Sequence, residues 1–263
     1  MTQWLRHWSR PALPRLRLLC LPPAGGAAHL FRAWGANLPL DVEVVAAELP
    51  GHGTRIDEPP MTRMVDVVAP LERALLALRP VPLVLFGHSM GANVGLEVCR
   101  WLRDSLPGWR PAGLVVAGAE ARESRRTAAP LADGTDRQLR RFLADAQGPH
   151  AQALAEERLV ELLLPPLRAD LALLADFPYE PALPLDCPVR VFTGTDDSFV
   201  TDADHADWAR ESDGDFAVEV FDGGHFFVRD AEPAVLASVQ RFLHARTPRA
   251  PISVVPPIHG RPR

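Results

Sequence analysis

The sequence predicts an α/β fold in which a mostly parallel central sheet is flanked by helices and carries a helical lid insertion. Three observations indicate this. Short apolar runs alternate with longer helix-like segments, a glycine-flanked serine joins one such run to the next helix-like segment, and a long segment at 121–177 has no strand signal. The alternation is typical of βαβ units, whose parallel strands are covered by helices on both faces.

Six apolar runs are expected to form the strands of this sheet. They lie at residues 16–21, 42–49, 83–86, 114–117, 189–192 and 216–221. Helices are expected over residues 92–102 and 234–242, where apolar side chains recur at helical spacing. Pro233 precedes the second of these helices, and proline is favoured in the first helical turn.

The segment at 121–177 interrupts the alternation between the fourth and fifth strand runs. It holds three helix-like patches rich in Leu and Arg, which predicts a helical insertion over one end of the sheet that acts as a lid. Residues 248–263 contain five prolines and little apolar periodicity, so we expect a disordered tail there. A single domain over residues 1–247 follows.

Composition excludes several classes of function. The 263-residue chain has a net charge of −5, and its 28 basic residues are all arginine. Without lysine there is neither Schiff-base chemistry nor a P-loop lysine, and a mildly acidic chain has no general attraction for nucleic acid. No apolar stretch approaches the roughly 20 residues needed to span a membrane, so we expect a cytoplasmic protein.

The potential metal ligands and thiols indicate no metal or cofactor. The three cysteines are widely separated and lack CxxC spacing, which favours buried free thiols over a disulfide framework or a zinc site. An acidic cluster is expected on a solvated helix face rather than around a metal. These residues are Cys20, Cys99 and Cys187, and Asp202, Asp204, His205 and Asp207.

The chemistry is indicated by the segment around Ser89. A buried strand run leads into Gly87-His88-Ser89-Met90-Gly91, and a helix-like segment follows at once. A bare GxSxG pattern is weak evidence, but this context is the one that a nucleophile elbow requires. A serine in such a turn has a strained backbone, and its glycine neighbours let strand and helix approach. The helix beginning at Met90 places free N–H groups beside an oxyanion formed at Ser89.

Two later strand runs end in candidate partners for Ser89. In α/β-hydrolases the serine is followed along the chain by Asp or Glu and then by His. Asp196 and Asp197 follow the run at 189–192, and His225 follows the run at 216–221. His225 is the candidate general base, and one of the two aspartates would orient it. Spacing alone does not separate Asp196 from Asp197.

A second oxyanion donor is expected after the first strand run. That run leads into Pro22-Pro23-Ala24-Gly25-Gly26, and because proline has no N–H, Ala24 is the first available donor. A plain turn is the alternative interpretation. The glycine pair lacks the GxGxxG spacing of a dinucleotide-binding fingerprint.

Taken together, the motifs resemble those of the type II thioesterases that accompany polyketide and nonribosomal peptide synthases. The resemblance extends over residues 8–243 and is marked at 20–26, 49–55, 86–92, 164–170 and 221–227. Residues 164–170 (Leu-Pro-Pro-Leu-Arg-Ala-Asp) discriminate best, because generic esterases share the elbow but not this lid element. The resemblance implies hydrolysis of acyl groups from the phosphopantetheine thiol of acyl or peptidyl carrier-protein domains.

The resemblance also implies roles for single residues. The family's catalytic Asp matches Asp197, with Asp196 as the fallback, and its oxyanion donors match the N–H groups of Ala24 and Met90. The chain departs from the usual pattern at Pro23, at His52, where relatives often carry Arg, and around residues 147–150. We expect a monomer without a cofactor.

Two other functions are compatible with these residues. A generic carboxylesterase or lipase would prefer oxygen esters, and a non-catalytic α/β-hydrolase-like binding protein would leave Ser89 unreactive toward a fluorophosphonate. Arginines in the lid segment are candidates for docking an acidic carrier domain, with a solvated face as an equal alternative. They are Arg122, Arg125, Arg126, Arg137, Arg140 and Arg141.

Overall fold

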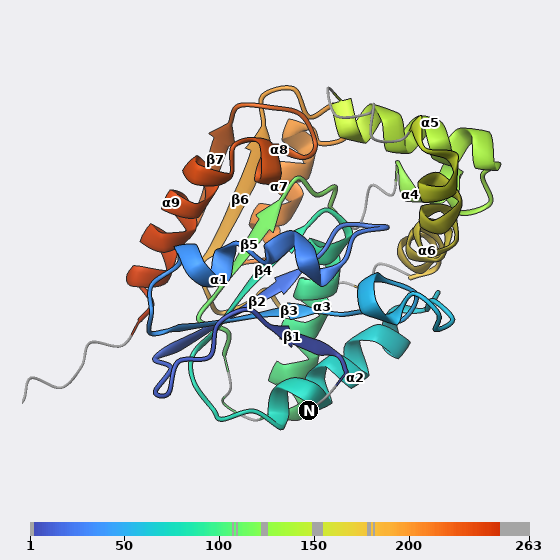
Figure 1. Ribbon diagram of the computed structural model, residues 1–263. Helices are drawn as coiled ribbons and strands as arrows, with labels where there is room; N and C mark the ends of the chain where they lie inside the picture. The colour runs from blue at the N-terminus through green and yellow to red at the C-terminus, as the bar shows by residue number, and fades with distance from the viewer. Residues whose placement is uncertain are drawn as a thin grey trace, which may run out of the picture.

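The computed structural model describes residues 3–106, 108, 110–121, 126–148, 155–177, 180 and 182–247. The tail expected at 248–263 lies outside these residues. In the described part, seven strands form one sheet in the order β1-β3-β2-β4-β5-β6-β7 (Figure 1). The strands are β1 (Leu5–His7), β2 (Leu16–Leu21), β3 (Val42–Ala47), β4 (Leu83–His88), β5 (Gly113–Ala117), β6 (Val189–Gly194) and β7 (Phe216–Phe221).

The sheet is parallel except at one edge. Strands β2 to β7 pair in parallel, while β1 pairs antiparallel with β3. Every residue of β2, β3, β4 and β5 is buried, as expected for parallel strands with helices on both faces. All six expected strands are present, and β1 is an additional edge strand of three residues.

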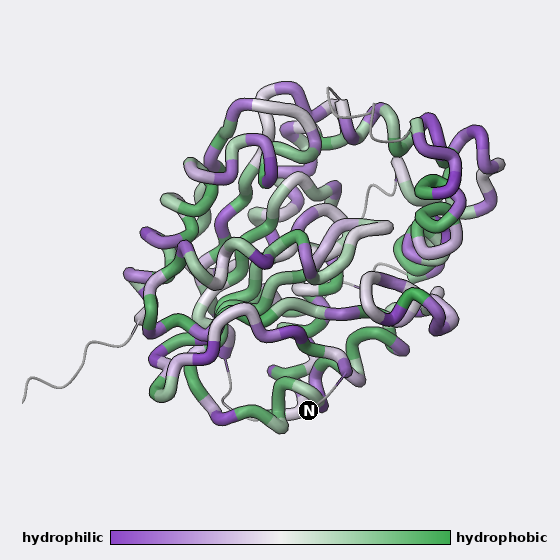
Figure 2. The backbone as a smooth tube through the Cα atoms, in the orientation of Figure 1, coloured by the Kyte–Doolittle hydropathy of each residue, from purple (hydrophilic) through white to green (hydrophobic). Residues whose placement is uncertain are grey.

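Helices cover the two faces of the sheet and build two hydrophobic cores. Helices α2, α3 and α7 pack on one face, where Leu71, Val98 and Trp208 are buried. The short helices η1 and α1 pack on the other face with α8 and α9, around Trp34 and Phe227. Figure 2 shows apolar backbone segments running through this interior. The helices outside the lid are η1 (Ala28–Phe31), α1 (Trp34–Asn37), η2 (Gly53–Arg55), α2 (Met64–Leu76), α3 (Met90–Ser105), α7 (Asp202–Arg210), α8 (Phe227–Asp230) and α9 (Glu232–His244).

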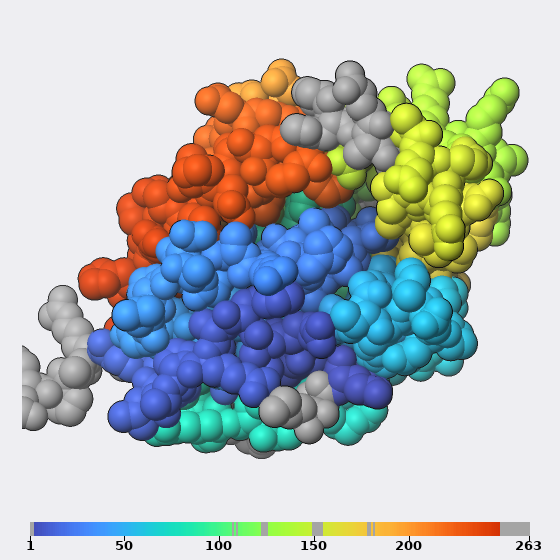
Figure 3. Space-filling view, in the orientation of Figure 1, coloured from blue at the N-terminus to red at the C-terminus, as the bar shows by residue number. Residues whose placement is uncertain are grey.

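In its described residues, the segment between β5 and β6 forms three helices, as expected for the lid. Its helices are α4 (Ala128–Ala132), α5 (Asp136–Gln147) and α6 (Glu157–Asp176). A Thr135–Gln138 capping box starts α5, and the lid has its own apolar cluster around Leu139 and Leu167. Figure 3 shows the lid as a yellow and yellow-green lobe at one side of the molecule, beside the segment around η2.

Two local expectations need correction, and one further helix forms that was not expected. Helices α3 and α9 extend beyond both ends of their expected ranges, and α2 forms although Pro70 lies in its middle. The acidic cluster does lie on a helix, α7, but Asp204 is buried rather than solvated. Its carboxylate accepts hydrogen bonds from the Ala121 N–H, from Thr201 and from Arg126, which offset the cost of burying the charge.

The cysteines are buried free thiols, as predicted. Burial raises the pKa of Cys20 and Cys99 well above the ordinary value and raises the pKa of Cys187 to about 12. None of the helices within the described ranges is both long and apolar enough to cross a bilayer.

Candidate active site

Ser89 stands at a strained turn between β4 and α3. It has φ 52° and ψ −118°, and it is the one non-glycine residue with positive φ in the described part of the chain. Its N–H donates to the carbonyl of Ala117 at 2.8 Å, which ties the turn to the end of the neighbouring strand β5. Such a backbone costs on the order of 1–3 kcal/mol and persists only where the surrounding structure enforces it.

The two glycines of GxSxG are required by close backbone packing. A Cβ atom on Gly91 would lie 2.2 Å from the carbonyl oxygen of Leu21, and one on Gly87 would lie 2.3 Å from the backbone of Ala92. Both distances are far below van der Waals contact. Helix α3 therefore begins directly against the carboxyl end of β2, which brings Ser89 beside the loop after that strand.

His225 and Asp197 lie together at the carboxyl ends of β7 and β6. The Nδ1–H of His225 donates to Asp197, with Oδ2 at 3.0 Å and Oδ1 at 3.2 Å. Asp197 is 8% exposed, whereas Asp196 is exposed to solvent. Burial acts to raise the pKa of Asp197, but the hydrogen bond and charge of His225 and the Phe199 N–H outweigh it and lower the pKa.

Because Nδ1 of His225 donates the hydrogen bond to Asp197, the lone pair of the ring is on Nε2. Ser89 and His225 line the same pocket, but no hydrogen bond joins the Ser89 hydroxyl to the imidazole within the described residues. Such contacts are often long in proteins without substrate and shorten in the complex. This geometry favours Asp197 over Asp196 as the residue that orients His225.

His88 supports this arrangement, and sequence reasoning did not single it out. Its Nε2–H donates to the carbonyl oxygen of His225 at 2.9 Å, and the two rings pack 5.3 Å apart. Burial lowers the pKa of His88 to about 3, so the ring is neutral near pH 7. The variable position of GxSxG thus holds the backbone of His225.

Ala24 and Met90 line the pocket beside Ser89. Met90 is the first residue of α3, and Ala24 lies in the loop after β2. Neither N–H donates a hydrogen bond within the described part of the chain. The loop is closed by the Gly26 N–H, which donates to the carbonyl of Pro23 at 2.8 Å. Both candidate oxyanion donors are therefore free to face a ligand.

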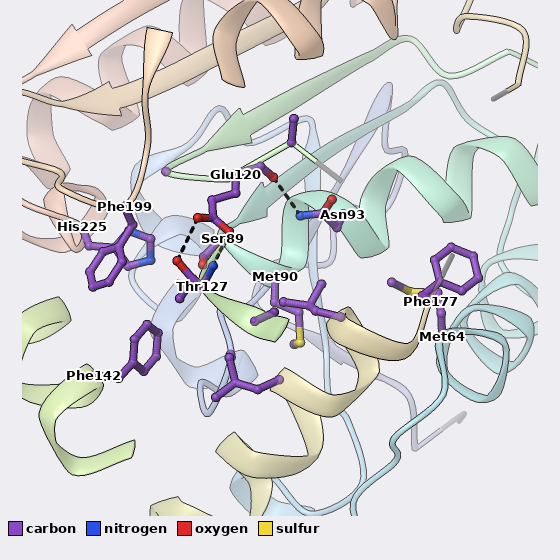
Figure 4. A pocket seen from close by; sticks show the side chains of 16 residues that line it. Met64, Ser89, Met90, Asn93, Glu120, Thr127, Phe142, Phe177, Phe199 and His225 are labelled. Carbon is purple, nitrogen blue, oxygen red and sulfur yellow. Dashed lines mark hydrogen bonds between the residues drawn. The ribbon is translucent and has the colours of Figure 1, made fainter. Parts of the chain in front are cut away.

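The pocket is an apolar chamber between the sheet and the lid. Its cavity volume is about 60 Å³. Figure 4 shows side chains from both walls around it. Phe142 of α5 packs edge-on to Phe199, which packs in turn on His225, with ring centroids 5.3 and 5.0 Å apart. The lining residues are Ala24, Met64, Ser89, Met90, Asn93, Gly118, Glu120, Ala121, Thr127, Ala128, Phe142, Leu171, Leu174, Phe177, Phe199 and His225.

Three of the six lid arginines considered as docking residues are paired on their own chain. Arg126 contacts Asp204 and Glu120, Arg140 contacts Glu157, and Arg141 contacts Asp145. Arg122 and Arg125 lie outside the described residues. Intramolecular pairing reduces the positive charge that this face presents, which favours the solvated-face interpretation for these three arginines.

The strand order, the strained serine turn and the acid and histidine at the next strand ends define an α/β-hydrolase with the site of a serine hydrolase. The Thioesterase domain family matches residues 16–243, and the chain belongs to this family. It is accordingly an enzyme, a serine hydrolase that acts on thioesters.

Three similar proteins place the chain within this family more closely. Thioesterase PikA5 of Streptomyces venezuelae is 32% identical over 86% of this chain and 80% of its own length. Gramicidin S biosynthesis protein GrsT of Aneurinibacillus migulanus is 29% identical over 88% of this chain and 90% of its own length. The solved structure of the type II thioesterase BorB from the borrelidin biosynthetic cluster superposes with a TM-score of 0.83 at 31% identity, covering 92% of this chain and 98% of that chain.

Proposed function

We propose that this protein is a type II thioesterase that removes acyl groups from the phosphopantetheine thiol of acyl or peptidyl carrier-protein domains. The synthases it serves would make polyketides or nonribosomal peptides. The observation that carries the proposal is the pocket, in which Ser89 and His225 face an apolar chamber roofed by a lid. The similarity to BorB and GrsT along most of the chain supports the choice of pathway.

Acylation begins when the Ser89 oxygen attacks the thioester carbonyl. Nε2 of His225 takes the hydroxyl proton as the C–O bond forms, and Asp197 stabilises the resulting imidazolium through Nδ1. The N–H groups of Ala24 and Met90 hold the tetrahedral oxyanion. Collapse breaks the C–S bond, and the thiolate takes the proton from His225, which leaves an acyl-enzyme and a free thiol.

Deacylation repeats the sequence with water. His225 takes a proton from the water as its oxygen attacks the acyl carbon, and collapse returns that proton to the Ser89 oxygen as the ester bond breaks. A thiolate leaves readily, whereas the serine oxygen is a poorer leaving group. We therefore expect hydrolysis of the acyl-enzyme to limit turnover for thioester substrates.

The lid supplies the site for the acyl chain. Leu171 and Leu174 of α6, with Phe142 of α5, line the chamber on its lid side. Burial of apolar carbons in it contributes about 0.8 kcal/mol per methylene group. The phosphopantetheine arm lets the bulky carrier domain remain outside while the thioester reaches Ser89.

The test is mass spectrometry of a panel of acylated carrier proteins after incubation with the enzyme, with Ser89→Ala as control. We expect loss of the acyl mass with the wild type and a decrease in rate of at least about 10⁴-fold with Ser89→Ala. A paired comparison of an acyl thioester and its oxygen ester accompanies the panel. Rapid hydrolysis of the oxygen ester together with inert acyl carriers would overturn the proposal.

A further inference from the structure

A buried carboxylate in the lid is bonded to the loop that carries the candidate oxyanion donor Ala24. Asp170 of α6 is 1% exposed. Its Oδ2 accepts the Gly25 N–H at 2.7 Å and contacts Nε2 of His52 at 2.9 Å. Three segments that are far apart in the sequence thus meet at one oxygen atom: the loop after β2, the loop before η2, and the lid helix.

His52 is held on both sides of its ring. Its Nδ1 lies 2.9 Å from the carbonyl oxygen of Pro50, while its Nε2 faces Asp170, and the residue is 3% exposed. Both neighbours are acceptors, so both contacts are hydrogen bonds only when both ring nitrogens carry a proton. If Nε2 loses its proton, its lone pair faces the Asp170 carboxylate and that hydrogen bond is lost. If Nδ1 loses its proton, the hydrogen bond to the Pro50 carbonyl is lost instead.

The Asp170 contact fixes the backbone next to the oxyanion donor. The bonded Gly25 N–H belongs to the peptide group that joins Ala24 to Gly25, so holding it restricts the rotation that aims the Ala24 N–H. Leu167, one turn before Asp170, packs against the same loop, because a Cβ on Gly25 would lie 3.5 Å from the Leu167 Cβ. Leu171, the next residue along α6, lines the chamber.

We propose that Asp170, held in place by His52, is a positioning residue that aims the Ala24 N–H at the oxyanion and so makes the catalytic step depend on the seating of lid helix α6. The inference rests on the proposed oxyanion role of Ala24. It adds to that role a residue of the lid which never touches the substrate. A carboxylate is suited to this position because one oxygen can accept two hydrogen bonds and also balance the charge on His52.

Asp170→Asn is the direct test, with Asp176→Asn on the same helix as the matched control, because Asp176 is exposed. The substrate is an acyl-N-acetylcysteamine thioester, which needs no carrier domain. We expect kcat to fall about 10²-fold in Asp170→Asn, the size of losing one oxyanion donor, while KM stays near the wild-type value and the protein remains folded at the assay temperature. Asp176→Asn should match the wild type.

Binding of a trifluoromethyl ketone analogue of the acyl thioester separates positioning from general damage. This analogue forms a tetrahedral adduct with a nucleophilic serine, so its affinity reports the oxyanion donors. We expect its affinity to fall in parallel with kcat in Asp170→Asn, while the affinity for the carboxylic acid product is unchanged. A merely structural role would weaken both ligands together.

The pH profile gives an independent readout through His52. Burial acts to lower the pKa of His52, but the charge and hydrogen bond of Asp170, the Pro50 carbonyl and the charge of Glu48 outweigh it and raise the pKa. Because the pKa is raised, the pair is intact at lower pH and is lost as pH rises through that pKa. We expect kcat to fall on this alkaline side, and His52→Arg, whose charge does not titrate, to abolish the fall.

Several outcomes would overturn the inference. One is a folded Asp170→Asn enzyme with wild-type kcat and wild-type affinity for the ketone, and another is an alkaline limb unchanged in His52→Arg. If Asp170→Asn does not fold, His52→Gln takes its place with the same expectations. A different result would overturn the proposed function itself: a Ser89→Ala variant that still hydrolyses the thioester, whatever the activity of Asp170→Asn.

Discussion

The two walls of the active-site pocket are built by different means. On the sheet side, backbone packing places the elements: Gly91 lies against the carbonyl of Leu21, and the Ser89 N–H is bonded to the end of β5. On the lid side, helices with their own apolar cluster meet the body through a few side chains, such as Asp170 and Phe142. The position of the sheet wall is therefore set by backbone contacts, whereas that of the lid wall is set by side-chain contacts that single substitutions can remove.

The sharpest test of the sheet wall is Asp197→Asn, compared with Asp196→Asn. An amide at Asp197 favours the wrong tautomer of His225, so we expect kcat to fall on the order of 10⁴-fold with little change in stability. Asp196 is exposed and should tolerate the same change. Steady-state hydrolysis of a thioester measures kcat in both variants. Equal decreases in kcat would contradict the assignment of Asp197 as the residue that orients His225.

Gly91→Ala tests the backbone packing, with Gly95→Ala one turn later in α3 as its control. The new Cβ on Gly91 would meet the Leu21 carbonyl at 2.2 Å, whereas that on Gly95 would meet the flexible side-chain ends of Leu21 at 3.1 Å and Leu114 at 3.4 Å. We expect Gly91→Ala to lower the free energy of unfolding by about 3 kcal/mol and Gly95→Ala to change it far less. Urea unfolding measures both, and a tolerated Gly91→Ala would show that the helix can shift.

His88→Gln tests how the sheet wall responds to acid. The pKa of His88 is about 3 in the folded state and 6.5 in its ordinary range, so only the unfolded chain binds the proton between these values. Stability from this residue is therefore present above pH 6.5 and is lost as pH falls, by about 1.4 kcal/mol per pH unit. Urea unfolding at pH 4, 5 and 6 should show this slope reduced in His88→Gln.

The exposed His244 provides the control for that measurement. His244→Gln should leave the dependence of unfolding free energy on pH as it is in the wild type. An unchanged slope in His88→Gln would mean that His88 carries its proton in the folded protein.

Phe142→Ala tests the side-chain contacts of the lid wall, with the exposed Leu162 on α6 as the control site. Truncation removes the ring that packs on Phe199 and enlarges the chamber. We expect KM for a medium-chain acyl thioester to rise about tenfold, with a much smaller change for the acetyl thioester. The measurement is KM as a function of acyl chain length for Phe142→Ala and for Leu162→Ala. If KM depends on chain length in the same way in both variants, Phe142 does not take part in acyl binding.

The buried parallel strands could be predicted from sequence because both faces are covered, so their runs are continuously apolar. Helix α2 was not among the expected helices. Pro70 removes one of its backbone hydrogen bonds, and Val67, Val68 and Leu71 pack into the core and offset that loss. The chain order of Ser89 and His225 was also readable, because each follows a strand run at the same edge of the sheet.

Long-range contacts set the limit of such prediction. Asp196 and Asp197 are adjacent, and only the shape of the turn decides that Asp197 faces His225. Asp170 and His52 are 118 residues apart, and although both lie in motifs of the resemblance, no local pattern indicates that they pair. The burial of Asp204 likewise depends on Ala121, 83 residues away.

The burial of all three cysteines has a practical consequence for studying this enzyme. Each turnover releases one thiol, and Cys20, Cys99 and Cys187 are at most 3% exposed and hold their protons firmly. A disulfide reagent such as dithionitrobenzoate reacts with thiolates in solution. The folded enzyme should contribute almost no colour of its own, so hydrolysis can be followed continuously, and the appearance of extra reactive thiols would report unfolding in the same cuvette.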